Sequence, residues 1–192
     1  MSRTVRTLWV LLVCLALVMA VGMWLHWGQA PDAGEKDNLR IIKPYVTWSG
    51  ARSQITKRSY FRITSSTEWS NLWLRHVEKG VEKDSFNRIV VPEVNFEEWM
   101  IIAVFQGKGW QNNGVVLDAI TEDADEMYVR FKNQPYSIAI PPGGVNREKQ
   151  VTAYGIFVIP RSPKPLVLEE KVGGYKGGPP AWEERVRFGR LE

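Results

Sequence analysis

WMIIAVF, at residues 99–105, is the stretch that decides how the larger part of this chain folds. All seven residues are apolar, acidic residues precede the run and Gly107 follows it closely. A short apolar run of this kind, bounded by charges and glycine, is typical of a strand that is buried on both faces. The sequence therefore predicts a central strand whose two sides must both be covered by other elements.

The segment before this run predicts a strand and then an amphipathic helix. Residues 59–64, SYFRIT, alternate in the manner of a strand. Ser65 and Glu68 have the spacing of a capping box, in which each side chain satisfies a free backbone N–H group. The apolar stripe that follows consists of Trp69, Leu72, Trp73 and Val77. This spacing predicts a helix over about residues 67–78 with one apolar face.

Four stretches downstream of residue 105 complete the predicted sheet. Residues 115–120 and 127–131 alternate in polarity, which predicts half-buried strands joined by a hairpin through the acidic residues 121–126. A long β-prone run covers residues 151–159, and residues 166–168 predict a short last strand. We expect an α+β fold, a β-rich mixed or antiparallel sheet of about five to seven strands with one packed amphipathic helix.

The N-terminus carries an uncharged apolar segment from Leu8 to Leu25. At about 1.5 Å per residue it is about 27 Å long, close to the hydrocarbon thickness of a bilayer. Arg3 and Arg6 precede it, which predicts that the N-terminus stays in the cytoplasm. Its length favours an uncleaved transmembrane anchor, and the alternative is a cleaved signal peptide. Both interpretations place the rest of the chain on the extracytoplasmic side of a membrane.

Composition divides the chain into four predicted regions. Residues 1–27 are the anchor or signal peptide, and residues 28–58 are a polar linker followed by an arm that is either a strand or pendant. Residues 59–170 form the folded domain. Residues 171–192 are a Gly/Pro-rich and charged tail, which we expect to be mobile and to contain a short helix or strand.

Charge and residue counts argue against several functional classes. The net charge of +4 comes without the clustered Lys and Arg of a nucleic-acid-binding surface. The single cysteine, Cys14, lies in the apolar segment, so the domain has no disulfide and no cysteine metal site. Only His26 and His76 are present, and there is no G-x-S-x-G motif. We therefore expect no cofactor, no metal site and no enzyme of the serine hydrolase type.

Carboxylates offer the remaining route to catalysis. Glu97 and Glu98, or the acids of residues 122–126, are the residue types that glycoside hydrolysis requires. However, adjacent acids on a strand point to opposite faces, and the acidic run has the pattern of a turn. An envelope enzyme that uses carboxylates is therefore kept as an alternative only.

The candidate binding site is the connection that follows the central strand. Its glycines precede another strand and not a helix, so they do not form a phosphate loop. Asn112, Asn113 and Gly114 tolerate positive φ and suit a turn. Trp110, at the tip, either folds back onto the core or is an exposed anchor for a protein partner. The candidate binding residues are Gly107, Lys108, Trp110, Asn112 and Asn113.

Three pieces of sequence also support a family resemblance. They are SYFRITSSTEWSNLW at residues 59–73, VNFEEWMIIAVFQGKGW at residues 94–110 and VTAYGIFVIPRSPKPLV at residues 151–167. Their order and spacing resemble the C-terminal domain of the PrcB family, which is named for a subunit of a bacterial surface protease complex. The chain departs from that pattern at Asn95, at residues 111–114 and at Ala153, where the family often has Asp, a Thr-Gly-Gly-Tyr type loop and Pro.

The resemblance implies a non-enzymatic binding or assembly module on the extracytoplasmic side of a bacterial cell membrane. Such a module would bind a protein partner and serve a protease complex as an accessory subunit. One alternative is a protease inhibitor that inserts the loop at residues 107–114 into an active-site cleft. A purely structural envelope protein is a further alternative that the sequence does not separate from a binding module.

Overall fold

The computed structural model describes residues 40–77, 85, 88–136, 150–173 and 181–192. All of them belong to one compact unit that spans Leu39–Glu192. The apolar segment from Leu8 to Leu25, with its predicted role as an anchor or signal peptide, lies outside the described residues. Within the described ranges, no helix has the length and the apolar character that crossing a membrane requires.

The described elements form two sheets, a short ladder and one helix. The five-stranded sheet has the order β1 (Arg40–Ile41), β6 (Asn112–Glu122), β7 (Met127–Pro135), β10 (Leu166–Val172) and β11 (Ala181–Phe188). The four-stranded sheet has the order β2 (Val46–Gly50), β9 (Tyr154–Pro160), β4 (Trp99–Phe105) and β3 (Ser59–Ile63). The ladder pairs β5 (Gly109–Trp110) with β8 (Gln150–Val151), and the helix is α2 (Ser66–His76).

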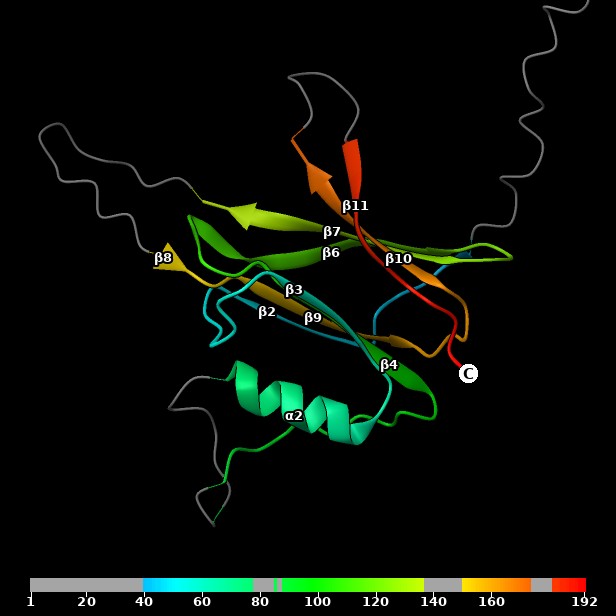
Figure 1. Cartoon of the computed structure of the whole chain (residues 1–192), viewed down its shortest axis with the longest axis horizontal. Helices are drawn as coiled ribbons and strands as arrows, with labels where there is room; N and C mark the ends of the chain where they lie inside the picture. The colour runs from blue at the N-terminus through cyan, green and yellow to red at the C-terminus, as the bar shows by residue number, and fades with distance from the viewer. Residues whose placement is uncertain (1–39, 78–84, 86–87, 137–149, 174–180) are drawn as a thin grey trace, which may run out of the picture. The chain divides into compact units, whose positions relative to one another are not determined.

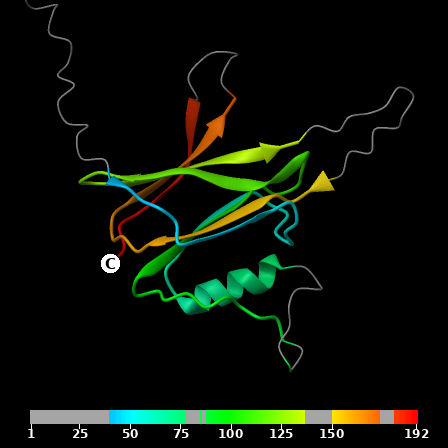
Figure 2. The same ribbon diagram turned by 180° about the vertical axis from the view of Figure 1, so that it is seen from behind.

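These elements stack in three layers. Figures 1 and 2 show, from opposite sides, α2 on one face of the four-stranded sheet and the five-stranded sheet on its other face. The pairing of β7 with β10 is parallel, and the other strand pairs are antiparallel. The α+β class with a β-rich, mixed arrangement and one helix is therefore confirmed for the described residues. The strands are divided between two packed sheets, whereas the sequence predicted a single sheet with fewer strands.

The central strand predicted from WMIIAVF is β4, and both of its faces are buried. Met100, Ile102 and Val104 belong to the core between the two sheets. Ile101, Ala103 and Phe105 belong to the core under α2. Because successive side chains of a strand point to opposite faces, one apolar run supplies both cores.

The helix begins where the capping box predicted. Ser65 Oγ accepts a hydrogen bond from the Glu68 backbone N–H at 3.3 Å. Glu68 Oε2 accepts from Ser65 Oγ and from the Thr64 backbone N–H, at 3.0 and 3.2 Å. The carboxylate therefore reaches the residue before the cap, and not the cap's own N–H as the motif predicts.

The apolar stripe of α2 is core, as the spacing predicted. Trp69 and Trp73 are 1% and 9% exposed, and both rings pack against Trp48 of β2. The Trp69 and Trp73 indole N–H groups donate to the backbone carbonyls of Pro92 and Val90 at 2.7 and 3.0 Å. Each buried tryptophan thus has a partner for its one polar group, and these bonds hold the segment that returns from α2 to β4.

Residues 40–58, predicted as part of a linker and arm, lie within the compact unit. β2 pairs with β9 along its whole length and forms an edge of the four-stranded sheet. Val46 and Trp48 face the helical core, while Thr47 and Ser49 are exposed. The alternation of apolar and polar residues that is typical of a strand is therefore present. The sequence alone left a strand and a pendant arm as alternatives, and the structure has the strand.

The C-terminal part of the sheet also extends beyond the prediction. β10 runs on to Val172, and Ala181–Phe188 of the expected mobile tail form the edge strand β11. Ion pairs to other elements help to hold β11, because Arg187 binds Glu126 of the β6–β7 hairpin and Arg185 binds Glu170 of β10. These long-range pairs have no signature in the local sequence.

The long run at residues 151–159 is divided between β8 and β9. Between them, Thr152 Oγ1 accepts from the Ser53 N–H and donates to the Ser53 carbonyl, both at 2.7 Å. This side-chain bridge replaces a strand pairing at Thr152, so that the β-prone run breaks there.

The acidic run between β6 and β7 forms a turn, in agreement with the prediction. Asp123 Oδ1 accepts from the N–H groups of Asp125 and Glu126, both at 2.8 Å. These two backbone bonds lower the pKa of Asp123. The aspartate therefore shapes the hairpin.

Candidate functional site

The loop after β4 is fixed at its base by a close backbone approach. Gly107 has φ +72°, and a Cβ atom there would lie 2.8 Å from the Arg58 backbone nitrogen. The Lys108 N–H donates to the Thr56 carbonyl at 3.1 Å. Glycine is required at residue 107 because the conformation and the contact both exclude a side chain. Gly107 therefore positions the loop and offers no side chain to a partner.

Trp110 is displayed at the tip of the loop. Its backbone pairs with Gln150 in the β5–β8 ladder, and Gln111 then turns the chain with φ 52°. The Trp110 side chain is 56% exposed, and among the described aromatic residues no ring stacks on it. Of the two orientations that the sequence left open, the structure thus has the exposed one.

The sequence predicted that Asn112, Asn113 and Gly114 would suit a turn with positive φ, and the structure agrees only in part. Gln111 and Gly114 have positive φ, whereas Asn112 and Asn113 of the described chain do not. Asn112 acts through its side chain, because its Oδ1 accepts from Gly114 N at 3.0 Å and Gln134 N at 3.3 Å. Asn112 Nδ2 also donates to Asn133 Oδ1 at 2.9 Å. Asn112 thus holds the start of β6 against the end of β7.

The remaining candidates differ in how available they are. Lys108 and Asn113 are exposed, beside the exposed Trp110. Asn112 is half-buried and engaged within the protein, so it shapes the surface instead of presenting a free amide. The structure therefore brings the five predicted residues together in one loop, but it exposes the side chains of only three of them.

A second segment, residues 51–58, lies against this loop. Besides the contacts of Arg58 and Thr56 with Gly107 and Lys108, the Ala51 carbonyl accepts from Thr152 N at 2.9 Å, next to β8. The segment therefore contacts the residues that immediately flank both strands of the ladder that carries Trp110. The sequence did not predict this juxtaposition, because the two segments are separated by α2 and β4.

His76, at the end of α2, anchors the same segment. Its Nδ1 lies 3.0 Å from Ser53 Oγ, and Ser53 Oγ also accepts from Ile55 N at 3.0 Å. The ring is 3% exposed and packs against Phe105 and Tyr154. Burial lowers the pKa of His76 to about 4, so the imidazole is neutral near pH 7. These contacts give His76 a structural role.

A cleft of about 150 Å³ opens beside Trp110. Exposed side chains of Arg58, Lys108 and Trp110 line it, together with the buried Val151 and Ala153. Gln106 and Asn133 complete its polar lining. This volume accommodates a side chain or a small group, and it is too small for a drug-sized ligand.

Behind this lining lies a buried carboxylate that the sequence did not single out. Glu170 is 3% exposed. Its Oε1 accepts from Gln106 Nε2 at 2.9 Å and Asn133 Nδ2 at 2.6 Å, and its Oε2 accepts from Arg185 Nε at 2.6 Å. The sequence held a signal for this residue. Glu170 follows Leu166 and Leu168 at two-residue spacing, so a predicted strand that continued past Leu168 would have placed Glu170 on the same inner face.

The negative charge of Glu170 is paired with the positive charge of Arg185. Burial lowers the pKa of Arg185, but the hydrogen bond and charge of Glu170 and the charge of Glu183 outweigh it, so the pKa is raised. Burial raises the pKa of Tyr60 nearby, and the charge of Arg58 opposes that rise. The carboxylate is therefore held by three donors and stabilises the base of the cleft.

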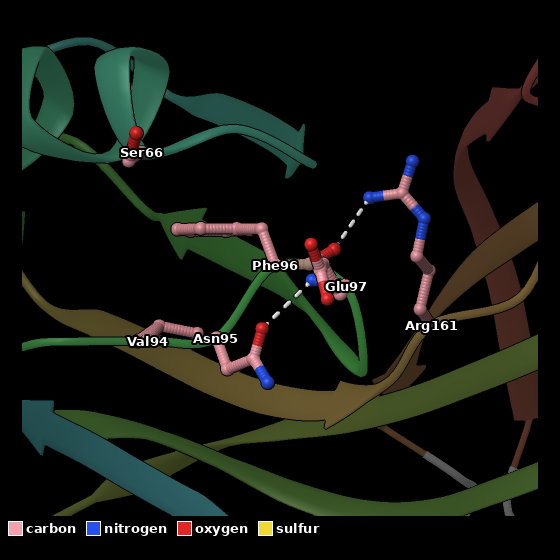
Figure 3. A pocket seen from close by; sticks show the side chains of 6 residues that line it. All are labelled: Ser66, Val94, Asn95, Phe96, Glu97 and Arg161. Atoms are coloured by element: carbon pink, nitrogen blue, oxygen red, sulfur yellow. Dashed lines mark hydrogen bonds between the residues drawn. The ribbon is translucent and has the colours of Figure 1, made fainter.

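A larger hollow of about 550 Å³ lies at the other end of β4 (Figure 3). Arg161 Nη1 donates to the Phe96 carbonyl at 2.8 Å and to the Thr64 carbonyl at 3.1 Å. Asn95 Oδ1 accepts from Glu97 N at 3.1 Å, and Figure 3 shows this bond beside the bond from Arg161 to Phe96. The side chains of Arg161 and Asn95 hold the turn before β4. Among the described residues that line the hollow, no set of acid, base and nucleophile converges on it.

The carboxylates that the sequence offered for catalysis are dispersed. Glu97 and Glu98 are exposed in the turn before β4. At the hairpin between β6 and β7, Glu122 pairs with Lys164 at 3.1 Å and Glu126 pairs with Arg187. No group of three or more His, Cys, Asp or Glu residues within the described ranges is arranged to hold a metal ion.

Comparisons with protein-family models, with curated proteins and with solved structures found no match for this chain. The resemblance to the PrcB family therefore stays a prediction that rests on the order of its sequence motifs.

Proposed function

We propose that the chain is a non-enzymatic binding or assembly module that uses the Trp110 loop to hold a protein partner. The exposure of Trp110 on a loop whose backbone is fixed carries this proposal. Tryptophan is enriched at binding hot spots because it buries a large surface at a small loss of conformational entropy. The predicted N-terminal anchor would hold the module on the extracytoplasmic side of the membrane, with a protease as the favoured class of partner.

Local geometry supports a preformed surface. The ladder with β8, the Lys108–Thr56 bond and the contact of Gly107 with Arg58 hold the loop from two sides. A preorganised loop loses less conformational entropy on binding than a flexible one. The cleft of about 150 Å³ beside Trp110 offers room for a side chain of the partner.

The test places a large aromatic photo-crosslinking amino acid, which keeps a bulky apolar ring in place of the indole, at residue 110 of the full chain in native membranes. A matched control carries it at residue 74, because Leu74 is also an exposed apolar residue, at 50%, but lies on α2. We expect one protein adduct from residue 110 that is absent from residue 74, and we expect Trp110→Ala to abolish co-purification of that protein. Equal adduct patterns from the two positions would contradict the proposal.

Protease inhibition is a second candidate, favoured by the fixed loop and its exposed tip. An inhibitor of this kind keeps its loop rigid so that it enters an active-site cleft in one conformation. If the captured protein is a protease, adding the purified full chain distinguishes the two candidates. Loss of peptide hydrolysis that Trp110→Ala restores would identify an inhibitor, whereas unchanged hydrolysis would identify an accessory subunit.

A further inference from the structure

The surface around Trp110 combines charges from two segments that are far apart in the sequence. Residues 51–58 carry three exposed basic side chains, and the loop after β4 carries one. We call these four residues the basic cluster: Arg52, Lys57, Arg58 and Lys108. Neither segment contains an acidic residue, and neither does β8 or Thr152 beside it.

Backbone contacts hold the basic cluster together. The Lys108–Thr56 hydrogen bond and the approach of Gly107 to Arg58 join the two segments. The His76–Ser53 contact and the reciprocal bonds between Ser53 and Thr152 fix the segment that carries Arg52. Arg58 and Lys108 thus line the cleft beside Trp110, and Arg52 and Lys57 are exposed on the same fixed segment as Arg58.

We infer that the partner docks an acidic protein surface on the basic cluster while Trp110 occupies an apolar site on that surface. The inference rests on the proposed function and specifies the chemistry of its partner. Like charges concentrated on one surface attract a partner of opposite charge and accelerate its association. The nearest buried acid, Glu170, does not neutralise the cluster, because Arg185 and two amides already bind its carboxylate.

An acidic protein fits this surface better than an anionic membrane does. Trp110 is the only exposed large hydrophobic residue in the segments that form the surface, as far as the structure describes them. Peripheral membrane binding usually relies on a broader apolar face of Trp, Phe and Leu. The cleft beside Trp110, with the polar Gln106 and Asn133 in its lining, is instead suited to a shaped, hydrogen-bonding partner.

The experiment measures the yield of the adduct from residue 110 in full chains that differ only in charge. Lys57→Gln with Arg58→Gln removes two charges of the basic cluster. Arg40→Gln with Lys43→Gln is the matched control, since these exposed cations lie near the opposite end of the four-stranded sheet. Crosslinking runs at about 0.05 and about 0.5 M salt, where screening differs strongly. Thermal melts verify that each variant is folded.

We expect the cluster variant to lower the yield at low salt by at least about fivefold, and the control to change it less than about twofold. High salt should lower the unmodified protein's yield to a similar extent. Peptides crosslinked from residues 57 and 108 should lie beside Asp or Glu of the captured protein, and reversing those acids to Lys should restore binding to a Lys57→Glu variant.

Three outcomes would overturn the inference in distinguishable ways. If a protein adduct forms but its yield changes neither with salt nor in the cluster variant, the inference of an acidic partner is wrong and the proposed function still stands. Adducts to lipid in place of protein would assign the surface to an anionic membrane. Absence of any adduct above the residue 74 control would contradict the proposed function itself.

Discussion

The two ends of β4 use aromatic and basic residues in opposite ways. At the Trp99 end, Trp99 stacks on Tyr45 with ring centroids 4.8 Å apart, and Arg161 donates to two backbone carbonyls. At the Phe105 end, Trp110 is 56% exposed and has no ring partner among the described residues. Lys108 beside it is exposed as well.

This difference shows that size alone does not identify the functional end. The larger hollow, about 550 Å³, lies beside Arg161, where the Arg161 and Asn95 side chains already hydrogen-bond the backbone of the turn before β4. The cleft of about 150 Å³ lies beside Trp110, where exposed side chains are held on a fixed backbone. Exposed groups on a rigid framework are more informative about binding than empty volume is.

The largest expected effect is on the core that supports both ends. Trp73→Ala should lower the free energy of unfolding by about 3–5 kcal/mol, because it leaves a cavity under the four-stranded sheet. Urea unfolding of the purified protein measures this, with Leu74→Ala, an exposed neighbour, as the control. A midpoint for Trp73→Ala equal to that of the control would show that this tryptophan is not core.

A pH change should affect the Phe105 end through His76. The folded-state pKa of about 4 lies below the unfolded value of 6.5, so the unfolded chain binds more protons between these two pH values. The contribution of His76 to stability is therefore complete above pH 6.5 and decreases as pH falls to about 4, by up to about 3 kcal/mol. Unfolding measured from pH 7 to pH 4 should show a weaker pH dependence in His76→Gln. An identical dependence in both proteins would exclude His76 as the titrating group.

Removing the guanidinium at the Trp99 end should produce a smaller loss of stability and no loss of binding. Arg161→Met keeps most of the side-chain stem but removes the bonds to Thr64 and Phe96. We expect about 1 kcal/mol of destabilisation, as for other exposed hydrogen bonds. Adduct formation from residue 110 should be unchanged; a matching loss of adduct would show that the two ends are coupled.

The smallest expected change in stability comes from the residue that matters most for binding. Trp110→Ala should shift the free energy of unfolding by no more than about 0.5 kcal/mol, since the side chain is exposed and outside the core. Thermal unfolding beside the co-purification assay separates the two effects. Destabilisation as large as that of Trp73→Ala would mean that Trp110 is a structural residue.

Patterns that are local in the sequence predicted their structures well. The seven apolar residues of β4, the capping box at Ser65 and the stripe through Trp69 and Trp73 all lie where their spacing indicated. Each depends on neighbours within a few residues, whose effect on backbone geometry and burial is direct. The loop that contains Trp110 was located for the same reason.

The division into two sheets, the strand β11 and the polar cluster around Glu170 were decided by the tertiary structure. Each depends on partners far away in the chain, as when Glu170 meets Gln106 and Arg185. The sequence by itself placed Trp110 at a loop tip but left its direction open. Its exposure follows from the pairing of β5 with β8 and from the segment at residues 51–58, contacts that only the folded chain brings together.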